Sequence, residues 1–448
     1  HGTCYFIPVY MAERVLMGEL SGHIGKTVSI AGFVDVRRDQ GKLVFFDFRD
    51  RSGAVQGVVL PASPAMEAAK EVRTEYVVQV EGMVNKRPEK NSVDRQNGDI
   101  ELSIQGIEIL SRAEELPFDK DTDLTIDTRF DYRPYTLRSQ RDRDIFSVQA
   151  TILDAYRNSL KRQGFTEFVA PALVGGDAEG GSAVFSVGYY NDKTAYLATS
   201  PQLYKQIMVG AFERVFTIAK IFRAEKSATT RHLSELTQMD FEMGFIQDEF
   251  DVMAVLEQTV RDVVLQIGEK HSAEFSRLGA QVPHVGVKFP ILTLAEAHQT
   301  LGVAPEDDMT PEHERAICEW ALKEHQCDFV FITKFPTAAR AFYTRGESKG
   351  LSRGFDLLFR GLEINSGAER IHDYTEMVER IKERGMDPKK FSFYLQAFKY
   401  GMPPHGGCST GLERFTARML NLANVKEASA FPRDMHRIDI LLSNPVTE

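Results

Sequence analysis

The sequence has few cysteines, no long apolar run and no excess of positive charge. Its four cysteines are not arranged as Cys-x-x-Cys, which argues against structural zinc and predicts reduced thiols: Cys4, Cys318, Cys327 and Cys408. No apolar run approaches the roughly 20 residues of a membrane helix, so we expect a cytoplasmic protein without a membrane partner. The formal net charge of −10 argues against indiscriminate nucleic-acid binding but is compatible with a local basic patch.

The length of the chain, 448 residues, predicts two or three domains with ample core. We expect the natural chain to begin at Met11 and leave the preceding residues out of the fold argument. We predict a first domain at residues 13–111 and a second at 138–448. The charged segment 112–137 between them contains Pro117 and Pro134 and suits a linker.

Short strand-like runs separated by turns fill the first domain. There are five of them: Thr27–Val34, Leu43–Arg49, Val55–Leu60, Tyr76–Val84 and Ile100–Leu110. One helical segment, Pro64–Val72, falls between the third and fourth runs. This order of elements predicts a small OB-type β-barrel.

The stretch Arg214–Phe245 reads as an antiparallel hairpin, because both halves alternate with period two around a polar loop, Lys226–Ser234. In the second half one face is predicted to be core and the other collects charge. The core face carries Thr237, Met239, Phe241, Met243 and Phe245, and the other face carries Gln238, Asp240 and Glu242. The first half ends with Arg223 and Glu225, and the loop adds Arg231 and His232. A hairpin with one ordinary solvated face is the alternative.

Three strings of the second domain resemble the motifs of the class II aminoacyl-tRNA synthetases. They are Gly164–Pro171 for motif 1, Phe222–Glu225 with Thr229–Leu233 for motif 2, and His405–Arg414 for motif 3. The motif 2 string is similar to the aspartate, asparagine and lysine subgroup. The resemblance implies an α+β protein, with an OB-fold barrel followed by a catalytic domain built on an antiparallel β-sheet flanked by helices. It also implies a homodimer that pairs through motif 1, although a helix at that position ordinarily packs within its own chain.

The resemblance assigns the substrate ATP to six residues: Arg223, Glu225, Arg231, His232, Glu363 and Arg414. Of these, Arg223, Arg231, His232 and Arg414 would act in catalysis, because a phosphorus that gains charge during transfer needs fixed cations around it. Glu363 and Ser366 would hold Mg²⁺, which prefers carboxylate, hydroxyl and phosphate oxygens.

The string Ser200–Gln206 resembles the aspartyl branch of the subgroup. The resemblance assigns aspartate binding to Glu179, Ser200, Gln202, Lys205, Asp240 and Arg370, with Glu179 in a glycine-rich lid that meets the α-ammonium group. Lys205 and Arg370 would converge on the substrate's carboxylate. Asparagine would leave these cations uncompensated, at a cost of about 3–5 kcal/mol if they are buried. Taken alone, Lys205 would be an exposed lysine on a helix and Glu179 a solvated loop residue.

The barrel strings Gly32–Asp39 and Phe45–Asp50 resemble the anticodon-binding barrel of the same subgroup. The resemblance implies that Arg38, Phe45 and Gln56 contact the anticodon, with a base stacked on Phe45 for about 1–3 kcal/mol. Phe45 could instead be core, although Phe46 lies on the opposite face of the strand. Asp35 motivates the hypothesis that the enzyme charges tRNA(Asn) as well as tRNA(Asp).

We therefore predict an enzyme that activates L-aspartate with ATP and Mg²⁺ and transfers it to tRNA. Three alternatives stay open: an enzyme of the subgroup that activates asparagine, an asparagine synthetase derived from the same fold, and an RNA-binding protein without catalysis. The chain departs from the family at Ser409, where glycine is usual, and at Leu236, where a phenylalanine usually stacks on adenine.

Overall fold

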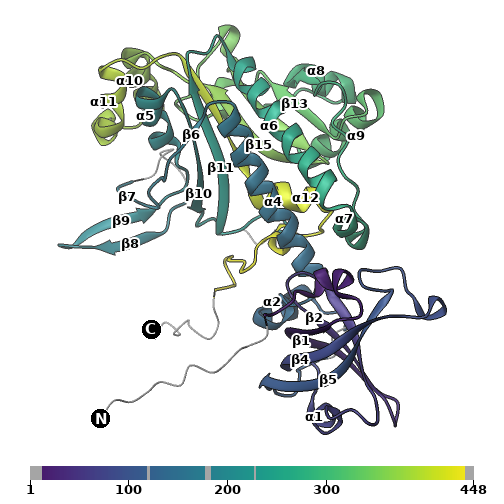
Figure 1. Cartoon of the computed structure of the whole chain (residues 1–448). Coiled ribbons are helices and arrows are strands. Elements are labelled where there is room, and N and C mark those ends of the chain that lie inside the picture. Colours follow the sequence, from purple (N-terminus) through teal and green to yellow (C-terminus); the bar gives the residue numbers. More distant parts are fainter. Residues whose placement is uncertain (1–12, 119–121, 177–182, 227–228, 439–448) are drawn as a thin grey trace. The chain divides into compact units, whose positions relative to one another are not determined.

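The computed structural model describes residues 13–118, 122–176, 183–226 and 229–438. The chain divides into two compact units, His1–Asp123 and Leu124–Glu448 (Figure 1). Among the described residues, no helix combines the length and the apolar character needed to cross a bilayer. Cys318, Cys327 and Cys408 are buried free thiols, and Cys4 lies outside the described residues.

The first unit is a closed five-stranded barrel in the order β1-β2-β3-β5-β4, which confirms the predicted OB fold. Its elements are β1 (Thr27–Asp39), β2 (Val44–Arg49), β3 (Ala54–Val59), α1 (Met66–Glu71), β4 (Val77–Lys86) and β5 (Ile100–Ser111). The helix lies between the third and fourth strands, as predicted. Alternate residues of the strands fill the interior, where Phe46 and Phe48 stack with ring centroids 5.4 Å apart.

The three predicted anticodon residues lie along one face of neighbouring barrel strands. Arg38 pairs in register with Phe45, and Asp47 pairs with Gln56. Arg38 Nη1 also donates to Asp47 Oδ2 at 3.0 Å. Phe45 is half-buried, whereas Phe46 is fully buried, so the period-two alternation places the two rings as expected. Asp35, on β1 beside a bulge, accepts from Arg49 Nε at 3.0 Å.

Part of the segment that we assigned to the linker is helical and belongs to the second unit. It forms α2 (Ile126–Asp131) and α3 (Arg133–Thr136). Arg133 is buried, and it donates to Asp142 Oδ1 at 2.8 Å and to the carbonyl of Ala430 at 2.6 Å. Pro134 lies in the first turn of α3, where its missing N–H leaves no hydrogen bond unmade. The proline therefore starts a helix instead of marking a linker.

The second unit is built on an eight-stranded sheet with the order β12-β13-β14-β15-β16-β11-β10-β6. The strands are β6 (Thr166–Glu167), β10 (Arg214–Phe222), β11 (Glu235–Gly244), β12 (Ile291–Thr293), β13 (Phe329–Thr333), β14 (Gly354–Phe359), β15 (Leu362–Glu369) and β16 (His405–Gly411). Every pair from β13 to β10 is antiparallel, as expected, and only the two outermost pairs are parallel. A smaller sheet projects from this unit (Figure 1): β7 (Leu173–Val174), β9 (Lys193–Leu197) and β8 (Ser186–Tyr189).

Two long helices, α4 (Gln140–Arg162) and α6 (Glu249–Lys270), lie across one face of the sheet (Figure 1). Their buried residues share one hydrophobic core with Met239 and Phe241 of β11. The helical spacing predicted for α4 is confirmed, since its apolar positions are buried: Ile145, Val148, Ile152, Ala155, Tyr156 and Leu160. Gly164, with φ of +83°, follows the end of α4 as the predicted stop. The core also includes residues of α7 (Ser272–Leu278) and α12 (Leu412–Met419).

The remaining helices form two further hydrophobic clusters. One joins α5 (Gln202–Phe212), α10 (Tyr374–Glu383) and α11 (Ser392–Lys399). The other packs α8 (Leu294–Leu301) and α9 (Pro311–His325) against the buried strand β13. The second cluster supplies a rigid support for α9, whose first turn approaches the functional site.

Candidate active site

The hairpin β10–β11 provides the floor of the site. Its strands pair from Arg214 with Met243 to Phe222 with Glu235, so the predicted hairpin is confirmed. Met239, Phe241 and Met243 are buried in the core as predicted, but Phe245 is 69% exposed. Phe245 lies just beyond the strand with φ of +59°, where the alternation of faces no longer applies.

At Asp240 and Glu242 the polar face of β11 is buried, not solvated, because α5 contacts it there. Asp240 and Glu242 are both fully buried, and they pair in register with Ser409 and Gly407 of β16. A Cβ on Gly407 would meet Glu242 Oε2 at 2.2 Å, so glycine is needed there to make room for the carboxylate. Two buried carboxylates on one strand require cations close by.

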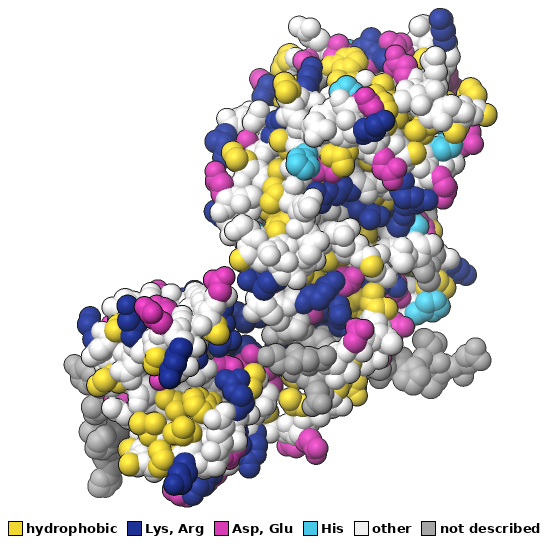
Figure 2. Space-filling model, turned by 90° about the vertical axis from the view of Figure 1, so that its right-hand side faces the viewer, with side chains coloured by type: hydrophobic (Ala, Val, Ile, Leu, Met, Phe, Trp, Pro, Cys, Tyr) yellow, Lys and Arg dark blue, Asp and Glu magenta, His cyan; other side chains and the backbone are white. Residues whose placement is uncertain are grey.

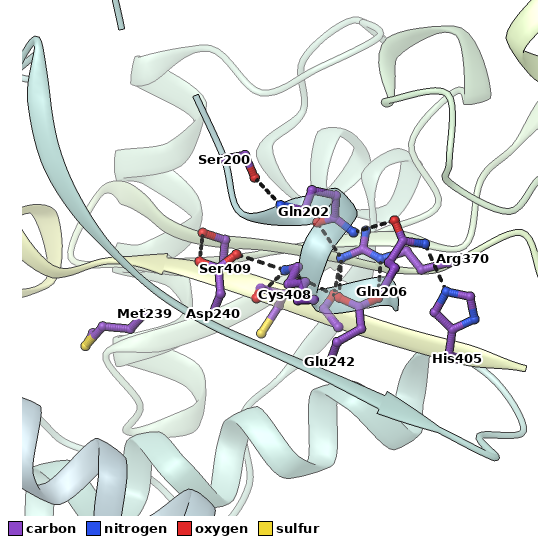
Figure 3. A network of polar contacts seen from close by, with 12 residues as sticks. Ser200, Gln202, Gln206, Met239, Asp240, Glu242, Arg370, His405, Cys408 and Ser409 are labelled. Atoms are coloured by element: carbon purple, nitrogen blue, oxygen red, sulfur yellow. Dashed lines mark hydrogen bonds and ion pairs between the residues drawn. The ribbon is translucent and has the colours of Figure 1, made fainter. Parts of the chain in front are cut away.

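Lys205 of α5 supplies one of these cations. Its Nζ is fully buried and lies 2.9 Å from Asp240 Oδ2, 3.1 Å from the carbonyl oxygen of Cys408 and 3.4 Å from Glu242 Oε2. Ser409 Oγ donates to the other oxygen of Asp240 at 2.7 Å (Figure 3). The serine that replaces the usual glycine therefore fixes the carboxylate that in turn holds the lysine.

Arg370 supplies the second cation. Its Nε donates to Glu242 Oε1 at 2.8 Å and its Nη2 to the carbonyl of Gly407 at 2.8 Å. Burial alone would raise the pKa of Glu242, but Arg370 and Lys205 together hold it below its usual value. Lys205 and Arg370 thus contact the two oxygens of one carboxylate, as Figure 3 shows for the arginine. The two cations that sequence reasoning aimed at a single point do converge, and Glu242 lies at that point.

A row of neutral groups orients this cluster. Gln206 Nε2 lies 2.9 Å from His405 Nε2, while Gln206 Oε1 accepts from Gln202 and from Tyr394, both at 3.0 Å. The side-chain amide of Gln206 is therefore oriented with its N–H₂ group toward His405, and His405 Nε2 must accept a hydrogen bond from it. His405 Nδ1 accordingly donates to the carbonyl of Pro403 at 2.9 Å. Burial lowers the pKa of His405 to about 4, so the ring is neutral near pH 7.

The other residues assigned to aspartate lie beside this network, with one exception. Gln202 is buried and its Oε1 is 3.5 Å from Arg370 Nη2. Ser200 is buried, and its Oγ accepts from the backbone N–H of Gln202 at 3.1 Å. Glu179 lies outside the described residues, so its predicted role stays untested.

Next to this network is a cavity of about 200 Å³ that gathers most of the residues assigned to ATP. Its wall includes Arg223, Arg231, His232, Glu363, Ser366, Ser409 and Arg414. Burial, and then Arg414, lowers the pKa of His232, which favours a neutral ring. Glu225 is not among the described residues that line the cavity; its carboxylate is 43% exposed and 4.0 Å from Arg223 Nη1. Leu236 lines the wall of the cavity. An aliphatic side chain therefore stands at the position where the family usually has a phenylalanine.

The residues assigned to Mg²⁺, Glu363 and Ser366, lie three residues apart on β15, and both line the cavity. Loss of solvent and the nearby charge of Asp356 raise the pKa of Glu363 to about 7. Asp356, which pairs in register with Ser366, was missed from the sequence. Arg340 donates to both Asp356 oxygens at 2.9 and 2.7 Å and to Ser366 Oγ at 3.2 Å. No cluster of three or more His, Cys, Asp or Glu side chains suited to a metal occurs in the described ranges. Glu363 and Ser366 still fit a hard cation, because both present oxygen atoms to the cavity and a cation would offset the repulsion by Asp356 that contributes to the raised pKa of Glu363.

Sequence reasoning also missed Glu242 as a member of the site. The signal was present, because Glu242 shares a strand face with Asp240 and Gln238. What the alternation could not reveal is that Lys205 and Arg370 reach that face from α5 and from the end of β15.

Comparison with known proteins extends over both units. The family described as tRNA synthetases class II (D, K and N) matches residues 125–435, and the OB-fold nucleic acid binding domain matches residues 28–110. Aspartate--tRNA(Asp/Asn) ligase of Thermus thermophilus is 42% identical over 437 residues, which is 95% of this chain and 99% of that protein. Aspartate--tRNA(Asp) ligase of Pyrococcus horikoshii is 36% identical over 428 residues, which is 92% of this chain and 96% of that protein.

Solved structures named for asparagine and for aspartate both superpose on this chain. An asparaginyl-tRNA synthetase from Pyrococcus horikoshii, complexed with asparaginyl-adenylate, gives a TM-score of 0.87 at 31% identity and covers 96% of this chain and all of that one. A putative aspartyl-tRNA synthetase from Leishmania major gives 0.88 at 27% identity, covering 98% and 97% of the two chains. Backbone similarity alone therefore does not distinguish aspartate from asparagine.

Proposed function

Because the chain belongs to the class II tRNA synthetases of the aspartate, lysine and asparagine group, we propose that it is an ATP-dependent aspartate–tRNA ligase. The observation that carries the proposal is the convergence of Lys205 and Arg370 on one buried point beside the arginine-lined cavity. The relatives named for aspartate at 36–42% identity support the choice of amino acid. An asparagine-activating enzyme is the less favoured alternative.

Selection of aspartate over asparagine depends on the buried network. Lys205 and Arg370 already pair with Asp240 and Glu242, so the expectation that asparagine would leave both cations uncompensated does not hold. Selection instead rests on which side chain can take over these cation contacts. The contact of 3.4 Å between Lys205 and Glu242 is the longest that the lysine makes, and the substrate's carboxylate replaces it. Arg370 binds Glu242 and the carbonyl of Gly407 through Nε and Nη2, and a guanidinium has five N–H donors, so it can also contact the substrate's carboxylate. An amide in this position offers no negative charge to either cation and presents an N–H₂ group to donors.

The first reaction step is attack of aspartate's α-carboxylate on the α-phosphorus of ATP, with pyrophosphate as the leaving group. Arg223, Arg231 and Arg414 hold the phosphates and stabilise the charge that develops on them. Mg²⁺ bound by Glu363 and Ser366 would neutralise phosphate charge when present. The 3′ hydroxyl of the terminal tRNA ribose then attacks the adenylate carbonyl and releases AMP. Positioning and fixed charge supply the rate, and no covalent enzyme intermediate is required.

The barrel binds the anticodon through the face that carries Arg38, Phe45 and Gln56. Although the chain is acidic overall, Figure 2 shows Lys and Arg side chains grouped on the larger unit, which suits a phosphate-rich partner. Relatives named for tRNA(Asp/Asn) at up to 42% identity support charging of both tRNAs. Since tRNA charging serves translation, we assign the protein to the cytoplasm.

A symmetric homodimer forms through the end of α4 and the strand that follows it. Val169, which follows β6, is 95% exposed in the single chain, and Phe212 at the end of α5 is 52% exposed. These apolar side chains suit burial against a second copy. Measurement of the mass in solution tests this part of the proposal separately.

Two assays test the proposed function. Exchange of labelled pyrophosphate into ATP should depend on aspartate and proceed at least about a hundredfold less efficiently with asparagine, which corresponds to roughly 3 kcal/mol. Equal exchange with asparagine would overturn the choice of substrate. Charging of purified tRNA(Asp) and tRNA(Asn) should both proceed; failure with tRNA(Asn) at high enzyme concentration would restrict the enzyme to tRNA(Asp).

A further inference from the structure

Arg231 lies in the connection between β10 and β11, yet it must present its charge at a defined point of the cavity. A long side chain on a loop loses about 1.5–2 kcal/mol of conformational freedom when it is fixed. If ATP had to order this side chain on binding, that cost would weaken the interaction. A protein partner that orders Arg231 beforehand would remove the cost.

Glu314 is such a partner. Its Oε2 lies 3.1 Å from Arg231 Nη1, and the two side chains are 12% and 24% exposed. Burial raises the pKa of Glu314, and Arg231 and Arg414 oppose that shift. No resemblance assigns Glu314 a role, and 83 residues separate it from Arg231 in the sequence.

The helix that carries Glu314 is firmly anchored. Thr310 caps α9 by accepting from the N–H of His313, and Glu314 lies in the first turn, where the helix dipole favours a carboxylate. Further along, Ile317, Cys318 and Ala321 are buried against β13 and α8. A loop arginine is thus tied to a helix that the hydrophobic core holds in position.

Glu314 leaves the arginine able to bind a phosphate. A guanidinium has five N–H donors, and only Nη1 of Arg231 is directed at Glu314. Arg231 also lines the cavity, whereas Glu314 is not among the described residues of its wall. The arginine therefore reaches the cavity while its carboxylate partner is not one of the described residues of the wall.

We propose that Glu314 is a positioning residue that orients Arg231 toward the terminal phosphates of ATP. That the nucleotide in the cavity is ATP rests on the proposed function. The positioning role differs from an inhibitory latch, in which Glu314 would compete with ATP for Arg231. The two readings predict opposite effects when the carboxylate is removed.

The test compares Glu314→Gln and Glu314→Ala with the unchanged full-length protein. The Kd for ATP, measured without amino acid, and the KM for ATP in pyrophosphate exchange should each rise about tenfold, which corresponds to 1.4 kcal/mol. The KM for aspartate should stay within about twofold. Glu312→Ala is the matched control, because Glu312 shares the first turn of α9 but is 73% exposed and pairs with Arg315. This control should leave both ATP constants unchanged.

A double-mutant cycle separates positioning from a direct or purely structural role. In an Arg231→Ala background, Glu314→Ala should have no further effect on ATP binding. A full tenfold effect in that background would overturn the proposal, and so would tighter ATP binding by Glu314→Ala alone. Melting curves identify a variant that fails to fold, in which case Glu314→Gln carries the test. If the unchanged protein binds ATP but shows no aspartate-dependent exchange, the proposed function fails while the ATP measurements still decide the role of Glu314.

Discussion

Replacement of Lys205 by methionine tests the buried charge network most directly. Methionine keeps much of the length of the side chain but removes the charge, so Asp240 and Glu242 lose a shared cation and the carbonyl of Cys408 loses a donor. Breaking one side of a buried ion pair costs about 3–5 kcal/mol. A typical domain has a total stability of only about 5–15 kcal/mol, so the variant should remain folded but be clearly weakened.

The single tryptophan makes this measurement specific to the catalytic unit. Trp320 packs against the hydrophobic cluster of α8, α9 and β13, so its fluorescence during urea unfolding reports on that unit and not on the barrel. Lys323→Met is the control, because the side chain of Lys323 is 83% exposed. Its unfolding free energy should change by less than about 0.5 kcal/mol. The KM of Lys205→Met for aspartate should rise at least about a hundredfold, while the Kd for ATP should stay within about threefold.

A second substitution gives a sharper version of the same experiment. In Lys205→Met combined with Asp240→Asn, a buried charge is removed along with its partner, so the loss of stability should be smaller than the sum of the two single losses. An unfolding midpoint of Lys205→Met equal to that of the Lys323→Met control would refute the reasoning. An unchanged KM for aspartate would refute the assignment of Lys205 to the substrate.

Three other predictions address separate parts of the molecule. His405 has a pKa of about 4 in the folded protein, below the usual 6.5 of the unfolded chain. Its contribution to stability is therefore complete above pH 6.5 and is lost as the pH falls toward 4. Urea unfolding at a series of pH values should show a loss of about 3 kcal/mol in the unfolding free energy over this range, and His405→Gln should lack this loss. Ser409→Ala should raise the KM for aspartate about fivefold by freeing Asp240, with recovery in Ser409→Thr and no change in the Kd for ATP. Phe45→Ala should raise the KM for tRNA at least about fivefold and leave pyrophosphate exchange unchanged; equal effects on both would contradict an anticodon role.

Much of the architecture could be predicted because the relevant signals are local. The period-two alternation of Arg214–Phe245 determines which residues of the hairpin share a face, and the helical spacing from Ile145 to Leu160 determines the buried side of α4. The order of five short strands and one helix similarly indicated the barrel. Local reasoning was wrong where a boundary mattered, as at Phe245, whose positive φ ends the alternation.

Only the tertiary structure decided which side chains meet. Glu242 lies between Lys205 and Arg370 because β16 joins β11 to β15, and α5 delivers the lysine to that part of the sheet. Glu314 reaches Arg231 because the core holds α9 beside the cavity. Sequence periodicity specifies the face on which a residue lies. The neighbours of that face come from segments far away in the chain, and their order is set by sheet pairing and helix packing, which no local pattern encodes.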